Sequence, residues 1–198
     1  GRKCSNYIAK TIPKIILKDE NYPSDIPKAL TNAFHKADRR FLELAKRTKL
    51  PDGSTGICVI IKGNKIYAAN AGDSRGVMSE GGKAVPLSED HKPDNEDERL
   101  RIEKAGGTVK NGRIKGKLAV SRGFGDLPYK DRETLGPLYV TCDPDIREFT
   151  VTPKTEFIIL ACDGLWDCIE NQDAIDFVRT RLNSAMNEKD LYMLTIEL

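Results

Sequence analysis

Apolar residues recur every three or four positions between residues 25 and 47, which is the spacing of an amphipathic helix. The apolar members of this pattern are Leu30, Ala33, Phe34, Ala37, Phe41, Leu42, Leu44 and Ala45. Ser24 and Asp25 offer capping side chains before it, and Pro27 is tolerated in an opening turn. We therefore predict a helix over 25–47. An earlier helical period, between residues 7 and 16, is interrupted by Pro13.

The pattern then changes to short apolar runs that are separated by turns. Two pairs of runs surround a Gly63-Asn64 turn and a Gly81-Gly82 turn, and they cover 57–61 with 66–71 and 77–78 with 85–87. Short β-rich runs around such turns predict hairpins. Later in the chain the pattern predicts strands over 139–142 and 146–151, a helix over 172–182 and the start of another helix at residue 189.

A strongly charged segment predicts a third helix that Gly106 and Gly107 end. We interpret its residues 96–103 as a solvated helix face with charge pairs four positions apart. The stretch over 108–138 is irregular and rich in glycine. Such a stretch is typical of a functional loop or a mobile subdomain.

One apolar run ends in acidic residues. Residues 157–162 are all apolar and lead into Asp163 and Gly164, which predicts a strand buried on both faces. A carboxylate at the exit of such a strand suits Mg2+, because hard cations prefer oxygen ligands on a rigid support. Aspartate is also common at helix N-caps and in turns, so the spacing alone leaves both roles open. Asp73 likewise follows the apolar run 66–71.

Composition fits one domain over 1–198, since 39% of its residues are hydrophobic. The 32 basic and 30 acidic residues nearly balance, and no basic stripe predicts nucleic-acid binding. The longest apolar runs are too short to span a membrane. Five cysteines without a Cys-x-x-Cys pair are typical of a reduced intracellular protein, cytoplasmic or nuclear.

Six blocks, in this order and at these intervals, resemble the metal-dependent protein phosphatase 2C family of serine/threonine phosphatases. The blocks cover residues 52–55, 69–75, 90–93, 98–107, 118–126 and 161–167. The resemblance implies an α+β fold, a sandwich of two mainly antiparallel sheets flanked by helices. It also implies a flap subdomain over 108–138 and phosphoprotein substrates.

The family's site is a cluster of aspartates at one edge of the sandwich, where two Mg2+ or Mn2+ ions hold the water that attacks phosphorus. By the resemblance, Asp163 is a ligand of this pair and Asp73 holds a third, weaker ion. A strand-end turn with its carboxylate on nearby backbone is the equal alternative for Asp73. Asp126 matches an acidic position near the same cluster. Ser121 and Arg122 are expected to organise the chain there rather than to do chemistry.

Two family motifs do not occur in these 198 residues: the early Asp-Gly-His-Gly-Gly motif and the Asp-Asn pair that enters the family's final strand. The expected catalytic acid would lie before Gly1, so the chain itself offers no catalytic residue. We expect an incomplete sandwich that is inactive alone and self-associates through unpaired strands. The alternative function is a non-catalytic, phosphatase-like module that binds a protein partner or regulates one.

Overall fold

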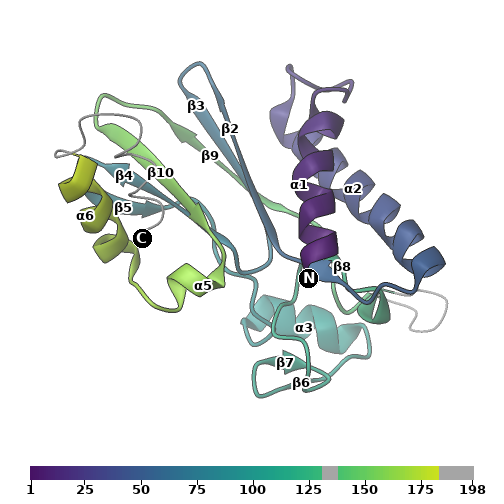
Figure 1. Ribbon diagram of the computed structural model, residues 1–198. Coiled ribbons are helices and arrows are strands. Elements are labelled where there is room, and N and C mark those ends of the chain that lie inside the picture. Colours follow the sequence, from purple (N-terminus) through teal and green to yellow (C-terminus); the bar gives the residue numbers. More distant parts are fainter. Residues whose placement is uncertain (131–137, 183–198) are drawn as a thin grey trace.

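Two three-stranded antiparallel sheets pack face to face in the centre of the computed structural model, which describes residues 1–130 and 138–182 (Figure 1). The first sheet has the order β2 (Gly56–Lys62), β3 (Lys65–Ala71), β9 (Asp145–Thr150). The second has the order β10 (Thr155–Ala161), β4 (Arg75–Glu80), β5 (Lys83–Pro86). Apolar side chains from both sheets, among them Ile66, Met78 and Leu87, form one core between them.

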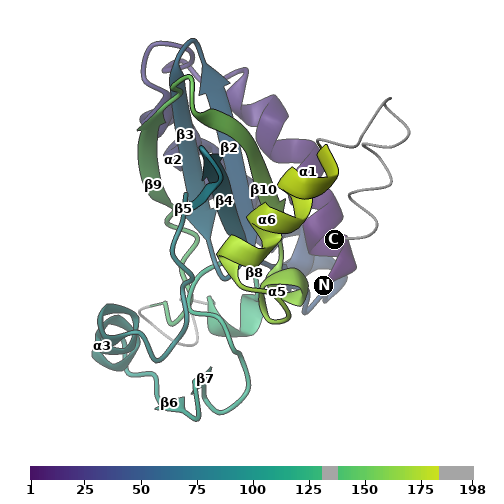
Figure 2. The same ribbon diagram turned by 90° about the vertical axis from the view of Figure 1, so that its left-hand side faces the viewer.

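Helices cover the outer face of each sheet (Figure 2). The helices α1 (Arg2–Ile16) and α2 (Ile26–Thr48) pack on the first sheet through a core that includes Phe34, Phe41 and Ala69. The helices α5 (Asp163–Trp166) and α6 (Asn171–Leu182) pack on the second sheet through Ile159, Trp166 and Ile175. The predicted α+β sandwich of antiparallel sheets with outer helices is therefore confirmed.

The third helix, α3 (Glu96–Lys104), has a small core of its own. Ile102 packs with Ile114, Tyr139 and Val140. The short hairpin β6 (Val109–Lys110) with β7 (Arg113–Ile114) completes this unit. It lies beyond the end of the sheets in both views (Figures 1 and 2). Part of the predicted flap, residues 131–137, and the helix expected from residue 189 lie outside the described residues.

The remaining short elements connect the sheets with this unit. The two-residue strands β1 (Gly53–Ser54) and β8 (Phe124–Gly125) pair with each other, and a 3-10 turn, η1 (Leu127–Tyr129), follows β8. No described helix is long and apolar enough to cross a membrane.

Both hairpins and the helix over 25–47 are present, with boundaries shifted by a few residues. Pro13 does not interrupt α1. It removes one backbone hydrogen bond, but Ile8, Ile12, Ile15 and Ile16 keep one continuous buried face. Burial of that face against α2 offsets the missing bond.

Two strand predictions were wrong in part. Residues 139–142 form no strand, and only Thr141 pairs, in an isolated parallel bridge with Arg122. The strand β10 is only partly buried, since Leu160 is 45% exposed, and it is an edge strand of its sheet among the described strands. Ile158 and Ile159 do alternate between the two cores.

Candidate functional site

The segments that carry Asp73 and Asp163 leave the sheets at the same end. The link from β3 to β4 carries Asp73 from one sheet to the other. β10 pairs with β4 so that Ala161 lies opposite Arg75. Asp163 comes two residues after Ala161, and Asp73 comes two residues before Arg75. Gly72 shapes the link with φ of +115°, and a Cβ there would overlap the side chain of Thr55, so a larger residue does not fit.

Asp163 is the first residue of α5 and is exposed. Cys162 occupies the N-cap position and makes no side-chain capping bond, so Asp163 is not a helix cap. No hydrogen bond or ion pair joins its carboxylate to another residue of the described ranges. A carboxylate that is free in this way can bind a cation without first losing another partner. The ligand role of Asp163 stays a prediction.

The short helix that carries Asp163 is anchored to the sheet by Trp166. Its indole Nε1–H donates to the carbonyl oxygens of Ala161 at 3.1 Å and Arg75 at 3.2 Å. The Arg75 guanidinium lies 5.5 Å from the ring centroid and donates two hydrogen bonds to Asp90, at 2.9 and 3.0 Å. These contacts fix the start of α5 relative to β4 and thus hold Asp163 beside the β3–β4 link.

Asp73 is buried, and its carboxylate forms an ion pair with the Lys92 ammonium. The alternative role for Asp73, a turn with its carboxylate on nearby backbone, is not what the structure shows. Its metal role stays a prediction. Lys92 belongs to the block 90–93 that carried the resemblance, but no role was predicted for it.

Asp126 has a left-handed backbone (φ +53°) and lies between β8 and η1. Burial raises its pKa to about 6, and the nearby carboxylates of Asp38 and Asp52 add to this, while Lys130 acts in the opposite direction. Lys130 is itself buried and donates to Asp38 at 2.8 Å. Asp126 therefore holds a proton far more readily than an exposed aspartate, and its place near a metal cluster stays a prediction.

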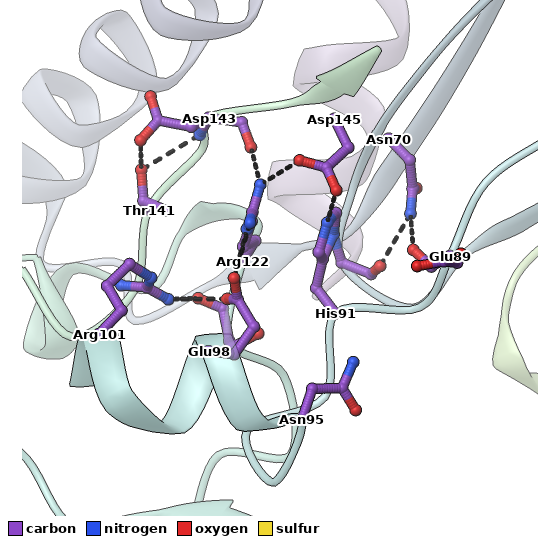
Figure 3. Close-up of polar contacts among 12 residues, drawn as sticks. Asn70, Glu89, His91, Asn95, Glu98, Arg101, Arg122, Thr141, Asp143 and Asp145 are labelled. Atoms are coloured by element: carbon purple, nitrogen blue, oxygen red, sulfur yellow. Dashed lines mark hydrogen bonds and ion pairs between the residues drawn. The ribbon is translucent and has the colours of Figure 1, made fainter. Parts of the chain in front are cut away.

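A network of charged side chains lies between α3 and the start of β9 (Figure 3). Arg122 donates to Glu98 at 2.6 and 2.9 Å and to Asp145 at 2.6 Å. Arg101 donates to the second oxygen of Glu98 at 2.9 Å. Arg122 thus organises the chain, as expected. Burial alone would raise the pKa of Glu98, but hydrogen bonds from Arg122 and Arg101 lower it to about 2.

His91 joins this network to the β3–β4 link (Figure 3). Its Nδ1 accepts a hydrogen bond from the backbone N–H of Gly72 at 3.1 Å, so the neutral ring carries its proton on Nε2. Nε2 lies 3.1 Å from the Asp145 carboxylate. Contact with His91 and Arg122 lowers the pKa of Asp145 to about 2. The block 90–93 is therefore tied to both the Asp73 link and the charged network.

The interpretation of residues 96–103 as a solvated helix face was wrong at Glu98, which is buried. Its side chain is only 5% exposed and contacts two arginines. The reason is a partner 24 residues further along the chain, which helical spacing cannot reveal. The available signal was that Glu98 and Arg122 both fall in blocks that carried the resemblance.

The three aspartates do not form a complete metal site. No three acidic, histidine or cysteine side chains within residues 1–130 and 138–182 gather closely enough to hold a metal ion. Asp163 offers a free carboxylate, and Asp73 already contacts a cation. The cation observed at Asp73 is the Lys92 ammonium, and the described residues do not supply a whole binuclear centre.

Comparison with known proteins identifies the family of the chain. The family model for protein phosphatase 2C matches residues 1–192. The chain is 43% identical to "Protein phosphatase 2C homolog 2" of Aspergillus fumigatus over 182 residues, which are 90% of this chain and 42% of that protein. It is 39% identical to "Probable protein phosphatase 2C 22" of Arabidopsis thaliana over 189 residues, which are 92% and 48% of the two chains.

Solved structures show the same fold. The serine-threonine phosphatase 2C from Toxoplasma gondii superposes with a TM-score of 0.82 at 22% identity, covering 100% of this chain and 76% of that one. A sex determining protein of C. elegans gives 0.79 at 24% identity, covering 97% and 47%. The fold class is thus a sandwich of two antiparallel sheets with outer helices. The chain belongs to the protein phosphatase 2C family, and it spans half or less of the length of the curated relatives it matches.

Proposed function

We propose that the protein hydrolyses phosphoserine and phosphothreonine in other proteins, with Mg2+ or Mn2+ bound at the end of the sheets where Asp163 lies. Family membership supports the reaction class. The observation that carries the proposal is the free, exposed carboxylate of Asp163 on a helix that Trp166 anchors. The unpaired cysteines support an intracellular location.

Each acidic residue has its own part in this proposal. Asp163 would ligate an ion of the core pair, whose remaining ligands the described residues do not supply. Asp73 would hold a weaker ion, and Asp126 would keep a carboxyl group close by. When bound, the metal ions supply a water that is acidic enough to attack near neutral pH and positive charge for the phosphoryl oxygens. Arg122 and His91 would fix the positions of the chain segments at this end of the sheets through their contacts with Asp145 and Gly72.

A second candidate is a phosphatase-like module that binds proteins without catalysis. It would need no cluster of metal ligands, and the described residues contain no three that converge. The two candidates differ in one assay of the full-length protein on phosphoserine, phosphothreonine and phosphotyrosine peptides. The enzyme should release phosphate from the first two with Mn2+ or Mg2+ and lose activity with a chelator. No release from any peptide at saturating metal would support the binding module.

We also propose that the 198-residue chain alone self-associates. Among the described strands, β2 and β10 are sheet edges. Both contribute to a groove of about 380 Å³ with an apolar lining that includes Ile8, Ile57 and Leu160. Unpaired edges beside apolar surface favour pairing with another chain. Sedimentation of the isolated chain as a stable monomer would contradict this.

A further inference from the structure

The negative charge of the Asp73 carboxylate is neutralised by a lysine, although this residue is expected to bind a metal ion. Its side chain is 6% exposed, so its charge has lost most of its hydration. Within the described ranges its one charged partner is the Lys92 ammonium. Lys92 is 35% exposed, so the ammonium can reach solvent by rotation of its side chain alone.

Lys92 is held near Asp73 by its backbone. The neighbouring His91 forms two hydrogen bonds with Gly72, one from its own N–H to the Gly72 carbonyl at 3.0 Å and one from the Gly72 N–H to its ring. Asn70 adds a bond from its side chain to the same carbonyl and another to that of Glu89. The stem of Lys92 therefore cannot move away from the β3–β4 link even when the ammonium does.

The ammonium lies in a place that favours cations. Besides Asp73, the carboxylates of Asp90 and Asp167 attract it, from the block 90–93 and from the end of α5. Asp90 is already paired with Arg75. A divalent ion on Asp73 would occupy the same surroundings, and two cations on one carboxylate repel each other.

We infer that Lys92 competes with a divalent metal ion for the Asp73 carboxylate and thereby sets the concentration of free metal at which that ion binds. The inference rests on the proposed function in one respect, that Asp73 can hold a metal ion. Binding there displaces the ammonium into solvent. The energy of the ion pair is subtracted from the energy of metal binding, so the Asp73 ion is weakly held even though its carboxylate is buried.

Binding of Mn2+ to the full-length protein tests this without substrate. Free Mn2+ is measured from its electron paramagnetic resonance spectrum during titration. We expect Lys92→Met to tighten the weakest site by about tenfold, which corresponds to about 1.4 kcal/mol. Lys65→Met is the matched control, because it removes a lysine–carboxylate ion pair with Glu148 at the start of β3, in which the two side chains are 42% and 46% exposed. It should leave every Mn2+ affinity unchanged.

The double variant Asp73→Asn with Lys92→Met identifies the site. The gain in affinity should disappear in it, since the carboxylate is gone. An unchanged or weaker affinity in Lys92→Met, or a gain that persists in the double variant, would overturn the inference. Failure of the proposed function is a different result, namely metal binding without phosphate release.

A measurement on the unmodified protein covers the case in which Lys92→Met does not fold. Metal binding at Asp73 should release the ammonium and raise its rate of acetylation by acetic anhydride severalfold. Lys65 serves again as the internal reference and should react at the same rate with and without Mn2+. Mass spectrometry of the peptides reports both lysines. Equal acetylation of Lys92 at zero and saturating Mn2+ contradicts competition.

Discussion

The two acidic regions of this protein treat their carboxylates in opposite ways. At the end of the sheets, Asp163 is exposed and has no ion-pair or hydrogen-bond partner among the residues described. Under α3, Glu98 is buried, and both of its oxygens accept hydrogen bonds from arginines. A paired carboxylate stabilises the fold and has little capacity for a further cation. A free one contributes little to stability and can bind a ligand. Asp73 is intermediate between Glu98 and Asp163. Its carboxylate is paired with the Lys92 ammonium, but that ammonium can move into solvent.

The largest effect should come from breaking the buried network. Arg122→Met removes the arginine that bridges Glu98 and Asp145 and leaves Glu98 with Arg101 alone. Loss of one partner of a buried ion pair costs about 3–5 kcal/mol, and we expect the lower end because Arg122 is 18% exposed. Urea unfolding measures the change.

A matched control removes an arginine from an exposed ion pair instead of a buried one. Arg147→Met removes an ion pair with Glu89 that is largely exposed, and it should cost less than about 1 kcal/mol. Equal losses for the two variants would mean that the network under α3 behaves as an ordinary surface ion pair.

The opposite behaviour is expected at Asp163. Asp163→Asn keeps the size of the side chain and removes its charge, and we expect phosphatase activity of the full-length protein to fall by at least about 100-fold, since a ligand should matter more than the groups that orient it. The melting temperature should not change, because no described residue pairs with this carboxylate. Asp173→Asn, an exposed aspartate in the first turn of α6, is the control. Wild-type turnover at saturating Mn2+ would remove Asp163 from the site.

Acid should weaken the network around Glu98. The pKa of Glu98 is about 2 in the folded protein, below its ordinary value of 4.5. Its stabilising contribution is therefore complete above about pH 4.5 and is lost as the pH falls toward 2. Linkage gives a loss of about 2 kcal/mol by pH 3. In Glu98→Gln this part of the pH dependence should be absent. Parallel stability curves for the two proteins between pH 5 and 3 would contradict the assignment.

The sequence predicted what depends on neighbouring residues. The hairpins around Gly63 and Gly81 and the helix α2 follow from turn chemistry and apolar spacing, and each was found within a few residues. The antiparallel sandwich came from the resemblance and not from the spacing. The strand predicted over 139–142 was wrong because Tyr139 and Val140 pack against α3 and β7 instead of entering a sheet.

The pairing of charges could not be predicted. Glu98 meets Arg122 and Asp73 meets Lys92 only because the fold brings together residues that are 24 and 19 positions apart. Along the sequence, Glu98 and Asp163 are both acidic residues in blocks that match the family. Two arginines contact Glu98 and none of the described arginines contacts Asp163. This difference arises only in the folded chain.

The smallest effect concerns the support of Asp163. Trp166→Phe removes one N–H that is shared between the carbonyls of Ala161 and Arg75, and a lost hydrogen bond of this kind costs about 1 kcal/mol. If these bonds hold the start of α5 in place, the variant should also need more Mn2+ for half-maximal activity.

Tyr7→Phe is the control for Trp166→Phe. It removes a polar group from an aromatic ring of the α1–α2 core, and no described residue bonds to that hydroxyl. It should leave the metal curve where it is. Superimposable metal curves for Trp166→Phe and wild type, at a melting temperature lowered by the lost bond, would show that Asp163 does not depend on the indole. In that case the backbone of β10 alone positions the carboxylate of Asp163. Asp163 and Glu98 would then differ further, because two arginines hold the Glu98 carboxylate in place.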